Sequence, residues 1–149
     1  MERSGLEAED EVYDLIYGFV RATKPEVCIE TGTAAGYGTA CIARALDANG
    51  SGHVWTVDLN ECQIEPHERI TQVRGDSLAF VEGFDRTADF AFVDCCFSGG
   101  RSQVVKALLA GGAATVLLHD TKLFGYPDEP RPDIVLPTDC GLAIWRGGA

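Results

Sequence analysis

The chain has 149 residues, 46% of them hydrophobic and 23% charged, a composition that fits a single globular domain with one core over residues 1–149. The formal net charge of −11 would repel phosphate backbones, so nucleic acid is a poor candidate for a partner. No apolar run approaches the roughly 20 residues that span a bilayer, and the first residues lack the basic-then-apolar layout of a signal peptide, so we expect a cytoplasmic protein.

The chain contains six cysteines but no C-x-x-C pair. Cys28 and Cys41 fall in apolar patterns, where a cysteine behaves as a small hydrophobic residue. Cys95 and Cys96 are adjacent and would form only a strained disulfide. We therefore predict reduced structural thiols rather than a zinc or redox site.

Apolar residues at helical spacing, bounded by glycine or proline, define the predicted helices. A capping-box pattern over residues 4–7 precedes the first of them. The first expected helix ends near Thr23. Three further helices are expected over residues 39–46, from Ser77 through Val81, and over residues 104–109, where Gly111 and Gly112 end the last one. The connection over residues 60–69 is too short and polar for a full helix, so one crossover is expected to be reduced.

Short apolar runs mark the predicted strands. They cover residues 27–29, 53–57, 70–73, 90–93 and 115–118, and two further strands over 134–136 and 141–145 are joined by a tight turn at 138–140. Residues 122–133 contain three prolines and are expected to form an irregular loop. The alternation predicts an α/β fold of the Rossmann-like, doubly wound type: a mostly parallel sheet with helices on both faces and an antiparallel C-terminal hairpin strand.

Acidic residues stand where the predicted strands end. Each of these strands is closed, or shortly followed, by an acid: Glu30, Asp58, Asp76, Asp94 and Asp120. In a doubly wound sheet these ends line one edge, where ligands bind. A carboxylate there needs a partner, such as a ribose hydroxyl, an amino group, a loop amide or a metal ion. The alternative, that such acids only cap helices, is left open for Asp76 above all.

The glycine-rich loop between Glu30 and Asp58 is compatible with two cofactors. Residues 36–41 imitate the nicotinamide fingerprint G-x-G-x-x-G, and Asp58 follows Gly38 by 20 residues, as that fingerprint requires. However, Cys41 replaces the third glycine, and an acid that closes the first strand would repel a pyrophosphate. An NAD-dependent oxidoreductase is therefore the less favoured alternative.

Six segments carry motifs: E-T-G-T-A-A-G-Y-G-T over 30–39, T-V-D-L-N over 56–60, G-D-S over 75–77, F-V-D over 92–94, L-L-H-D-T over 117–121 and G-L-A-I-W-R over 141–146. In this order they resemble the motifs of class I S-adenosylmethionine-dependent methyltransferases, in the branch of catechol O-methyltransferase-like and cephalosporin-hydroxylase-like proteins. The resemblance covers roughly residues 5 to 146. It implies S-adenosylmethionine as cofactor and methyl transfer to an oxygen of a small-molecule acceptor.

The resemblance implies a role for each matching residue. The methionine part of the cofactor would be held by Glu30, Gly32, Thr33, Gly36, Tyr37, Gly38 and Thr39. Asp58 with Leu59 would bind the ribose, Asp76 with Ser77 would border the adenine, and Asp94 would also lie against the cofactor.

The resemblance also implies a catalytic group at the fourth and fifth strand ends. Asp94 and Asp120 match two acids that bind a divalent cation in metal-dependent members, where the metal lowers the pKa of a substrate hydroxyl. Mg or Ca would bind at these two residues, with His119 as a third ligand, a base, or only a hydrogen-bonded residue. Since adjacent side chains of a regular strand point to opposite faces, we expect only one of His119 and Asp120 to join the site, unless the strand breaks there, and favour Asp120.

The chain departs from the family pattern at positions that matter for catalysis. Catechol-type members carry a basic residue shortly after the fourth-strand acid, where this chain has C-C-F-S over residues 95–98. Thr121 stands at the position of a metal-binding Asn, and Gly38 replaces a Ser. The metal and the base therefore stay open, and so does a homo-oligomeric state. A module that binds S-adenosylmethionine without catalysis is kept as an alternative.

Overall fold

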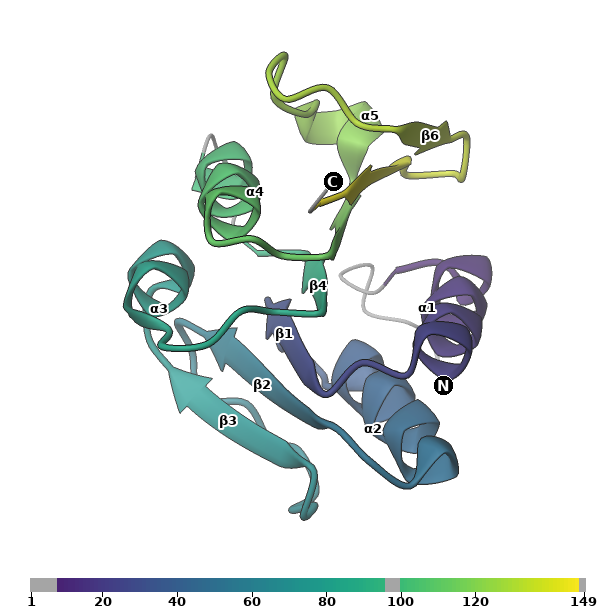
Figure 1. The fold of residues 1–149 in the computed structure, drawn as a ribbon, viewed down its shortest axis with the longest axis vertical. Helices are drawn as coiled ribbons and strands as arrows, with labels where there is room; N and C mark the ends of the chain where they lie inside the picture. The colour runs from purple at the N-terminus through teal and green to yellow at the C-terminus, as the bar shows by residue number, and fades with distance from the viewer. Residues whose placement is uncertain (1–7, 96–99, 148–149) are drawn as a thin grey trace.

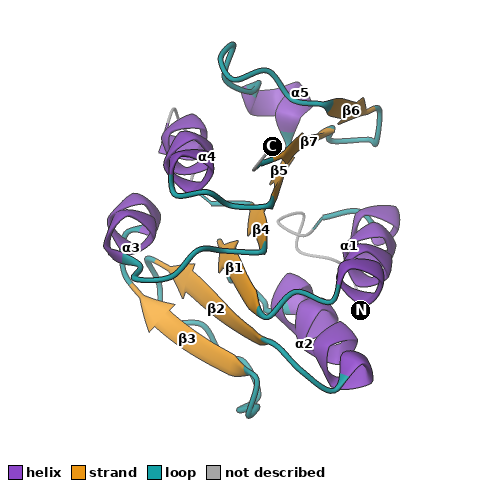
Figure 2. Cartoon of the chain, viewed as in Figure 1, coloured by secondary structure: helices purple, strands orange, loops and turns teal. Residues whose placement is uncertain are grey.

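The computed structural model describes residues 8–95 and 100–147, which form a central sheet with helices packed on it (Figure 1). The helices are α1 (Asp10–Thr23), α2 (Tyr37–Asn49), α3 (Ser77–Gly83), α4 (Gly100–Ala110) and α5 (Thr121–Phe124). The strands are β1 (Val27–Thr31), β2 (His53–Asp58), β3 (Ile70–Arg74), β4 (Phe90–Val93), β5 (Thr115–His119), β6 (Ile134–Leu136) and β7 (Leu142–Arg146) (Figure 2).

The sheet has the strand order β3-β2-β1-β4-β5-β7-β6. Strands β1 to β5 pair in parallel, and β7 runs antiparallel to both β5 and β6. The order reverses between β1 and β4, which brings the carboxyl ends of the parallel strands to one edge beside the reversal point. The predicted Rossmann-like, mostly parallel sheet with an antiparallel C-terminal hairpin is confirmed.

Two hydrophobic cores flank the sheet, one under each layer of helices. The helices α1 and α2 cover one face, and α3 and α4 cover the other (Figure 1). Neighbouring residues of β5 point to opposite faces, so Leu117 packs with Ile16 and Leu46 while Leu118 packs with Val105. Because both faces are covered, β4 and β5 are buried along their whole length and read in the sequence as continuous apolar runs.

The helix α1 ends as the sequence predicts. It stops at Thr23, and Lys24 closes it in the left-handed conformation. At its start, Glu9 occupies the N-cap position, but its side chain makes no capping bond to the helix because it reaches the site described below. The capping-box residues 4–7 lie outside the described part of the chain.

The later connections agree with the sequence in one place and differ in another. Between β2 and β3, no helix is described over residues 59–69, as expected for a reduced crossover. The prediction of an irregular loop over 122–133 was wrong at its start, because α5 follows β5 directly. The amides of Thr121 and Lys122 donate to backbone carbonyls of the turn over residues 138–141, so the C-terminal hairpin holds this short helix in place.

The five cysteines of the described residues are all free thiols, in agreement with the sequence analysis. Cys28, Cys41 and Cys95 are buried, whereas Cys62 and Cys140 are half-buried. Burial raises the pKa of the Cys41 thiol, which suits a packing role rather than a reactive one.

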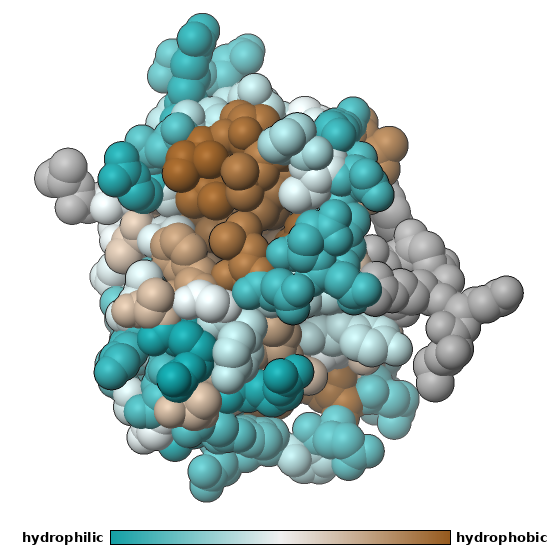
Figure 3. Space-filling model, turned by 90° about the vertical axis from the view of Figure 1, so that its right-hand side faces the viewer, coloured by the Kyte–Doolittle hydropathy of each residue, from teal (hydrophilic) through white to brown (hydrophobic). Residues whose placement is uncertain are grey.

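The face that carries α1 shows a concentrated apolar area on the molecular surface (Figure 3). A shallow groove between α1 and the β6–β7 hairpin is lined by Val12, Leu15, Leu136 and Pro137. The edge strand β6 also exposes Ile134. Among the described helices, none combines the length and apolar character that crossing a membrane requires.

Leu117→Ala should lower the free energy of unfolding by about 2–5 kcal/mol, because truncation leaves a cavity at the centre of the sheet. Leu117 is fully buried, whereas Leu123 is 69% exposed on α5. The matched control Leu123→Ala removes the same atoms and should change stability by less than about 0.5 kcal/mol. Urea denaturation of both variants measures the difference, and equal losses would contradict the central place of Leu117.

Candidate functional site

A glycine at position 32 lets the loop after β1 pass directly over the end of β4. Gly32 has a φ of +90°, and a Cβ atom there would lie 2.3 Å from the carbonyl oxygen of Asp94. Two backbone bonds close the junction: the Gly32 amide donates to Val57 over 2.8 Å, and the Asp94 amide donates to Thr31 over 2.9 Å. Any side chain at position 32 would push the loop away, so this junction holds the loop and Asp94 together.

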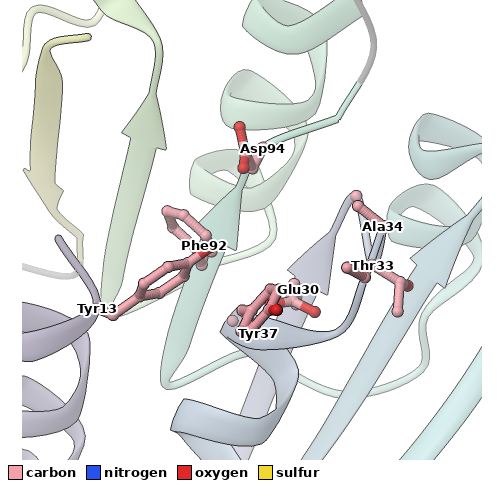
Figure 4. A pocket seen from close by; sticks show the side chains of 10 residues that line it. Tyr13, Glu30, Thr33, Ala34, Tyr37, Phe92 and Asp94 are labelled. Atoms are coloured by element: carbon pink, nitrogen blue, oxygen red, sulfur yellow. The ribbon is translucent and has the colours of Figure 1, made fainter. Parts of the chain in front are cut away.

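A pocket opens beside this junction, between the loop, the start of α2 and the end of β4 (Figure 4). Its lining includes the predicted residues Glu30, Gly32, Thr33, Tyr37, Gly38 and Asp94. It also includes residues that the sequence reasoning missed: Tyr13, Ala34, Ala35 and Phe92. Phe92 shares a strand face with Asp94, so alternation could have placed it there. Tyr13 comes from α1 and carries no local signal.

Glu30 is the buried acid of this pocket, with only 1% of its surface exposed. Its Oε1 accepts hydrogen bonds from the hydroxyls of Thr39 and Thr56. Its other oxygen lies so close to Gly38 that a Cβ atom there would stand 2.3 Å from it. Burial raises the pKa of Glu30 to about 7, although the two hydroxyl donors act in the opposite direction. The carboxyl group therefore ties β1, β2 and α2 together.

The acids of β2 and β3 hold backbone amides at the sheet edge. Asp58 accepts the amide of Ala34 at one oxygen over 3.0 Å and that of Asn60 at the other over 2.9 Å. It therefore fastens the glycine loop to the end of β2. Asp76 caps α3 by accepting the amide of Ala79 over 2.8 Å, which is the capping role that the sequence left open.

The remaining predicted cofactor residues do not line the pocket. Gly36 begins α2 with a φ of +85°, and Thr39 is buried beneath that helix turn. Leu59 is 61% exposed just beyond β2, whereas Ser77 is buried at the start of α3. The structure thus gathers the residues expected at the methionine part. It spreads those expected at the ribose and adenine along the neighbouring strand ends.

Asp94, His119 and Asp120 meet at the ends of β4 and β5. His119 Nδ1 lies 3.2 Å from an oxygen of Asp94 and 3.4 Å from an oxygen of Asp120. Only one of His119 and Asp120 was expected to join the site unless the strand broke there, and the strand does break at this point. The strand ends at His119, and Asp120 takes the left-handed conformation with a φ of +57°, which turns both side chains toward Asp94.

Two residues that the sequence reasoning missed complete this acid cluster. Glu9 lies 2.5 Å from His119 Nε2, so both ring nitrogens of the histidine face carboxylates. Arg101 is 4% exposed, and its guanidinium lies 3.6 Å from Asp94 and 3.6 Å from Asp120. The sequence could have indicated Arg101, because it is a basic residue seven positions after Asp94 and shares a helix face with the apolar residues of α4. Glu9 carried none.

The acid cluster holds its histidine as an imidazolium. Burial lowers the pKa of His119, but the hydrogen bond to Asp94 and the nearby carboxylates outweigh this and raise it to about 9. Burial raises the pKa of Glu9, but the Cys140 amide and His119 outweigh this and lower it to about 2. Burial and the adjacent acids raise the pKa of the Cys140 thiol to about 11. At neutral pH the pair of Glu9 and His119 is therefore charged.

Two overlapping triads of the described residues could offer ligand atoms to a cation. The atoms of Asp94, His119 and Asp120, and those of Glu9, His119 and Cys140, lie within 4.8 Å of one another. Carboxylates suit hard cations, and a thiolate with an imidazole suits softer ones. Both triads depend on His119, whose nitrogens would first have to release protons.

A family model described as a methyltransferase domain matches residues 29–121. The matched range contains the glycine loop and the ends of β1, β2, β4 and β5. A comparison with curated protein sequences gave no match.

Solved structures with a similar fold are methyltransferases. PaMTH1 from Podospora anserina, bound to S-adenosylhomocysteine, has a TM-score of 0.75 and 15% identity, over 97% of this chain and 81% of that chain. The O-methyltransferase TomG from Streptomyces achromogenes, in complex with S-adenosylmethionine, has a TM-score of 0.72 and 20% identity, over 96% and 82%. A methyltransferase from Geobacter sulfurreducens has a TM-score of 0.71 and 19% identity, over 96% and 82%. At these identities the likeness shows the fold.

Glu30→Gln should change how stability depends on pH. The folded protein raises the Glu30 pKa from 4.5 to about 7, so between these values it binds a proton that the unfolded chain has released. This stabilisation is complete below the unfolded pKa and is lost as the pH rises through the folded one. Glutamine keeps an oxygen for Thr39 and Thr56 but does not ionise. The difference between the melting temperatures of the variant and the wild type should therefore increase in favour of the variant from about pH 5 to about pH 8.

The control is Glu65→Gln, at an exposed carboxyl outside the site. Melting curves across the pH series should show the wild-type pH profile for this control. A difference between Glu30→Gln and the wild type that stays constant across the series would show that Glu30 does not titrate in this range.

Proposed function

This chain belongs to the methyltransferase-domain family, and on that premise we propose that it transfers the methyl group of S-adenosylmethionine to an oxygen atom of a small-molecule acceptor. The observation that carries the proposal is the pocket at the ends of β1 and β4, which shares Asp94 with the acid cluster. A cofactor in that pocket would have its reacting end beside a group of fixed charges that can orient an acceptor hydroxyl.

The pocket and the adjoining strand ends suit the parts of this cofactor. The aromatic rings of Tyr13 and Phe92 line the pocket, and aromatic faces attract a cation such as the sulfonium. Each oxygen of Asp58 already accepts one amide and has capacity for one more donor, which a ribose hydroxyl would supply. The structures of PaMTH1 and TomG, which hold S-adenosylhomocysteine and S-adenosylmethionine, support this choice of ligand.

The proposed reaction is an in-line displacement. The acceptor oxygen attacks the methyl carbon, the carbon–sulfur bond breaks, S-adenosylhomocysteine leaves and the hydroxyl releases its proton to solvent water. Asp94 is placed to accept a hydrogen bond from that hydroxyl, because it lines the pocket and also contacts His119. His119 has carboxylates at both ring nitrogens, so we assign it to holding Asp94 rather than to accepting a proton.

A binding module without catalysis is the second candidate. It is favoured by the internal pairing of the acid cluster, in which His119 and Arg101 already contact the carboxylates. Release of S-adenosylhomocysteine during incubation with S-adenosylmethionine and a panel of phenols and catechols would support the enzyme. The nicotinamide alternative meets a physical obstacle, since Gly38, where a pyrophosphate would approach, abuts the Glu30 carboxyl group.

Mg or Ca at Asp94 and Asp120 remains a prediction from the family resemblance. The two carboxylates offer the oxygen ligands that such ions prefer. However, the positive side chains of Arg101 and His119 contact the same oxygens, so the residues present do not fit a divalent cation. No step of the proposed reaction is assigned to a metal.

S-adenosylhomocysteine at about 1 mM should raise the melting temperature, because a ligand that binds only the folded state at 100 times its Kd adds about 2.7 kcal/mol. NAD at the same concentration is the control and should produce no shift. A scan of thermal unfolding with each ligand measures both. A shift with NAD and none with S-adenosylhomocysteine would reverse the assignment of the cofactor.

Asp58→Ala should weaken S-adenosylhomocysteine binding at least tenfold, since each hydrogen bond to a charged group contributes about 1.5–3 kcal/mol. Asp58→Asn keeps one acceptor oxygen and should lie between the variant and the wild type. Asp85→Ala is the matched control, because the Asp85 side chain is 91% exposed and lies outside the pocket. Calorimetric titration of S-adenosylhomocysteine into the three variants measures these affinities. Unchanged affinity would restrict Asp58 to holding the Ala34 and Asn60 amides.

A further inference from the structure

We propose that the guanidinium of Arg101 takes the place of a divalent cation between Asp94 and Asp120, so that this site binds neither Mg nor Ca. Metal-dependent members of the resembling family use the matching acids as cation ligands. The consequence for catalysis rests on the proposed methyl transfer. The test below measures cation binding itself, so the two proposals can fail separately.

The geometry places the guanidinium between the two carboxylates. Arg101 Nη2 lies 3.6 Å from Asp94 Oδ1, and Nη1 lies 3.6 Å from Asp120 Oδ2. Nη2 also donates a hydrogen bond to the main-chain carbonyl of His119 over 2.5 Å. The ring of Phe124 lies 5.1 Å from the guanidinium carbon on α5. These contacts hold the cationic group at one position rather than leaving it in solvent.

A permanent positive charge already lies against both acids. His119 Nδ1 faces the same two carboxylates that Arg101 contacts, and its Nε2 faces Glu9. The guanidinium of Arg101 carries a permanent positive charge and lies beside both carboxylates. A divalent ion bound to the same carboxylates would lie within a few ångströms of this like charge, which repels it.

The position of the family's third ligand gives a second, independent argument. That position is held by Thr121, which is 7% exposed. Its hydroxyl lies against the backbone of Gly141, where a Cβ atom would stand 2.4 Å from it. A threonine placed in this way supplies no carbonyl oxygen comparable to that of an asparagine. The oxygens of Asp94 and Asp120 thus lack the side-chain oxygen that asparagine supplies at this position in metal-dependent members of the resembling family.

The burial of Arg101 gives Asp94 and Asp120 a role that requires no metal ion, which is to pair with its guanidinium. Arg101 lies on the same face of α4 as the buried residues Val104 and Val105. A buried guanidinium is stable only when carboxylates pair with it, and a buried carboxylate needs a positive partner in turn. The pairing gives Asp94 and Asp120 a structural reason to be acidic. Methyl transfer should then proceed at the same rate with EDTA as with added Mg.

The first arm of the experiment uses the wild-type protein after dialysis against EDTA. MgCl₂ and CaCl₂ are titrated into it by calorimetry, with S-adenosylhomocysteine present and absent. We expect no binding up to low millimolar concentrations in either case. Micromolar binding that Asp94→Asn removes would overturn the proposal, whether or not the protein methylates any acceptor.

The second arm removes the guanidinium. Arg101→Gln should gain affinity for Ca or Mg of at least tenfold over the wild type, and adding Asp94→Asn should abolish the gain. Arg86→Gln is the matched control, because Arg86 is half-exposed and pairs with Asp85, which is not an acid of the cluster, and it should gain nothing. A folded Arg101→Gln protein that still binds neither ion would overturn the proposal. If that variant fails to fold, the wild-type titration decides alone.

Discussion

The pocket and the acid cluster depend on Gly32, which has no side chain and lies where the strand order reverses. The strands β1 and β4 are neighbours at this point, so the loop after β1 can lie directly on the backbone of Asp94. Because only hydrogen stands at Gly32, the junction is closed by main-chain bonds on both sides. The pocket forms on one side of this junction and the acid cluster on the other. Asp94 belongs to both the pocket and the acid cluster, because its backbone lies against Gly32 at this junction.

The sequence predicted those parts of the fold whose signals are local. The strands β4 and β5 are buried on both faces, so their apolar runs could be found without knowledge of their neighbours. The acids at the strand ends followed from the same runs, since each acid ends or closely follows one of the apolar runs. The pocket residues between Glu30 and Gly38 were predictable for a similar reason. A short loop between a strand and a helix leaves its residues little choice of position.

The parts that the sequence did not predict come from contacts between distant segments. Tyr13 and Glu9 reach the site because α1 packs beside it, and nothing within residues 8–23 indicates which end of the sheet that helix meets. The sequence left open whether His119 and Asp120 both join the site, because this depends on a left-handed residue other than glycine. Arg101 was not predicted because residues 95–98, directly after Asp94, include no basic residue, and the basic group lies farther along, in the first turn of α4.

The contact between Glu9 and Cys140 has a consequence for the order of events during synthesis. The amide of Cys140 donates to a carboxylate that lies 131 residues earlier in the chain. A ribosome adds about 5–20 residues per second, so Glu9 emerges many seconds before its partner does. A nascent chain that ends before β7 would already contain the glycine loop. Its strand β5, however, would have an unpaired edge that can pair with other chains. Completion of the hairpin therefore both closes the acid cluster and protects the newborn protein from aggregation.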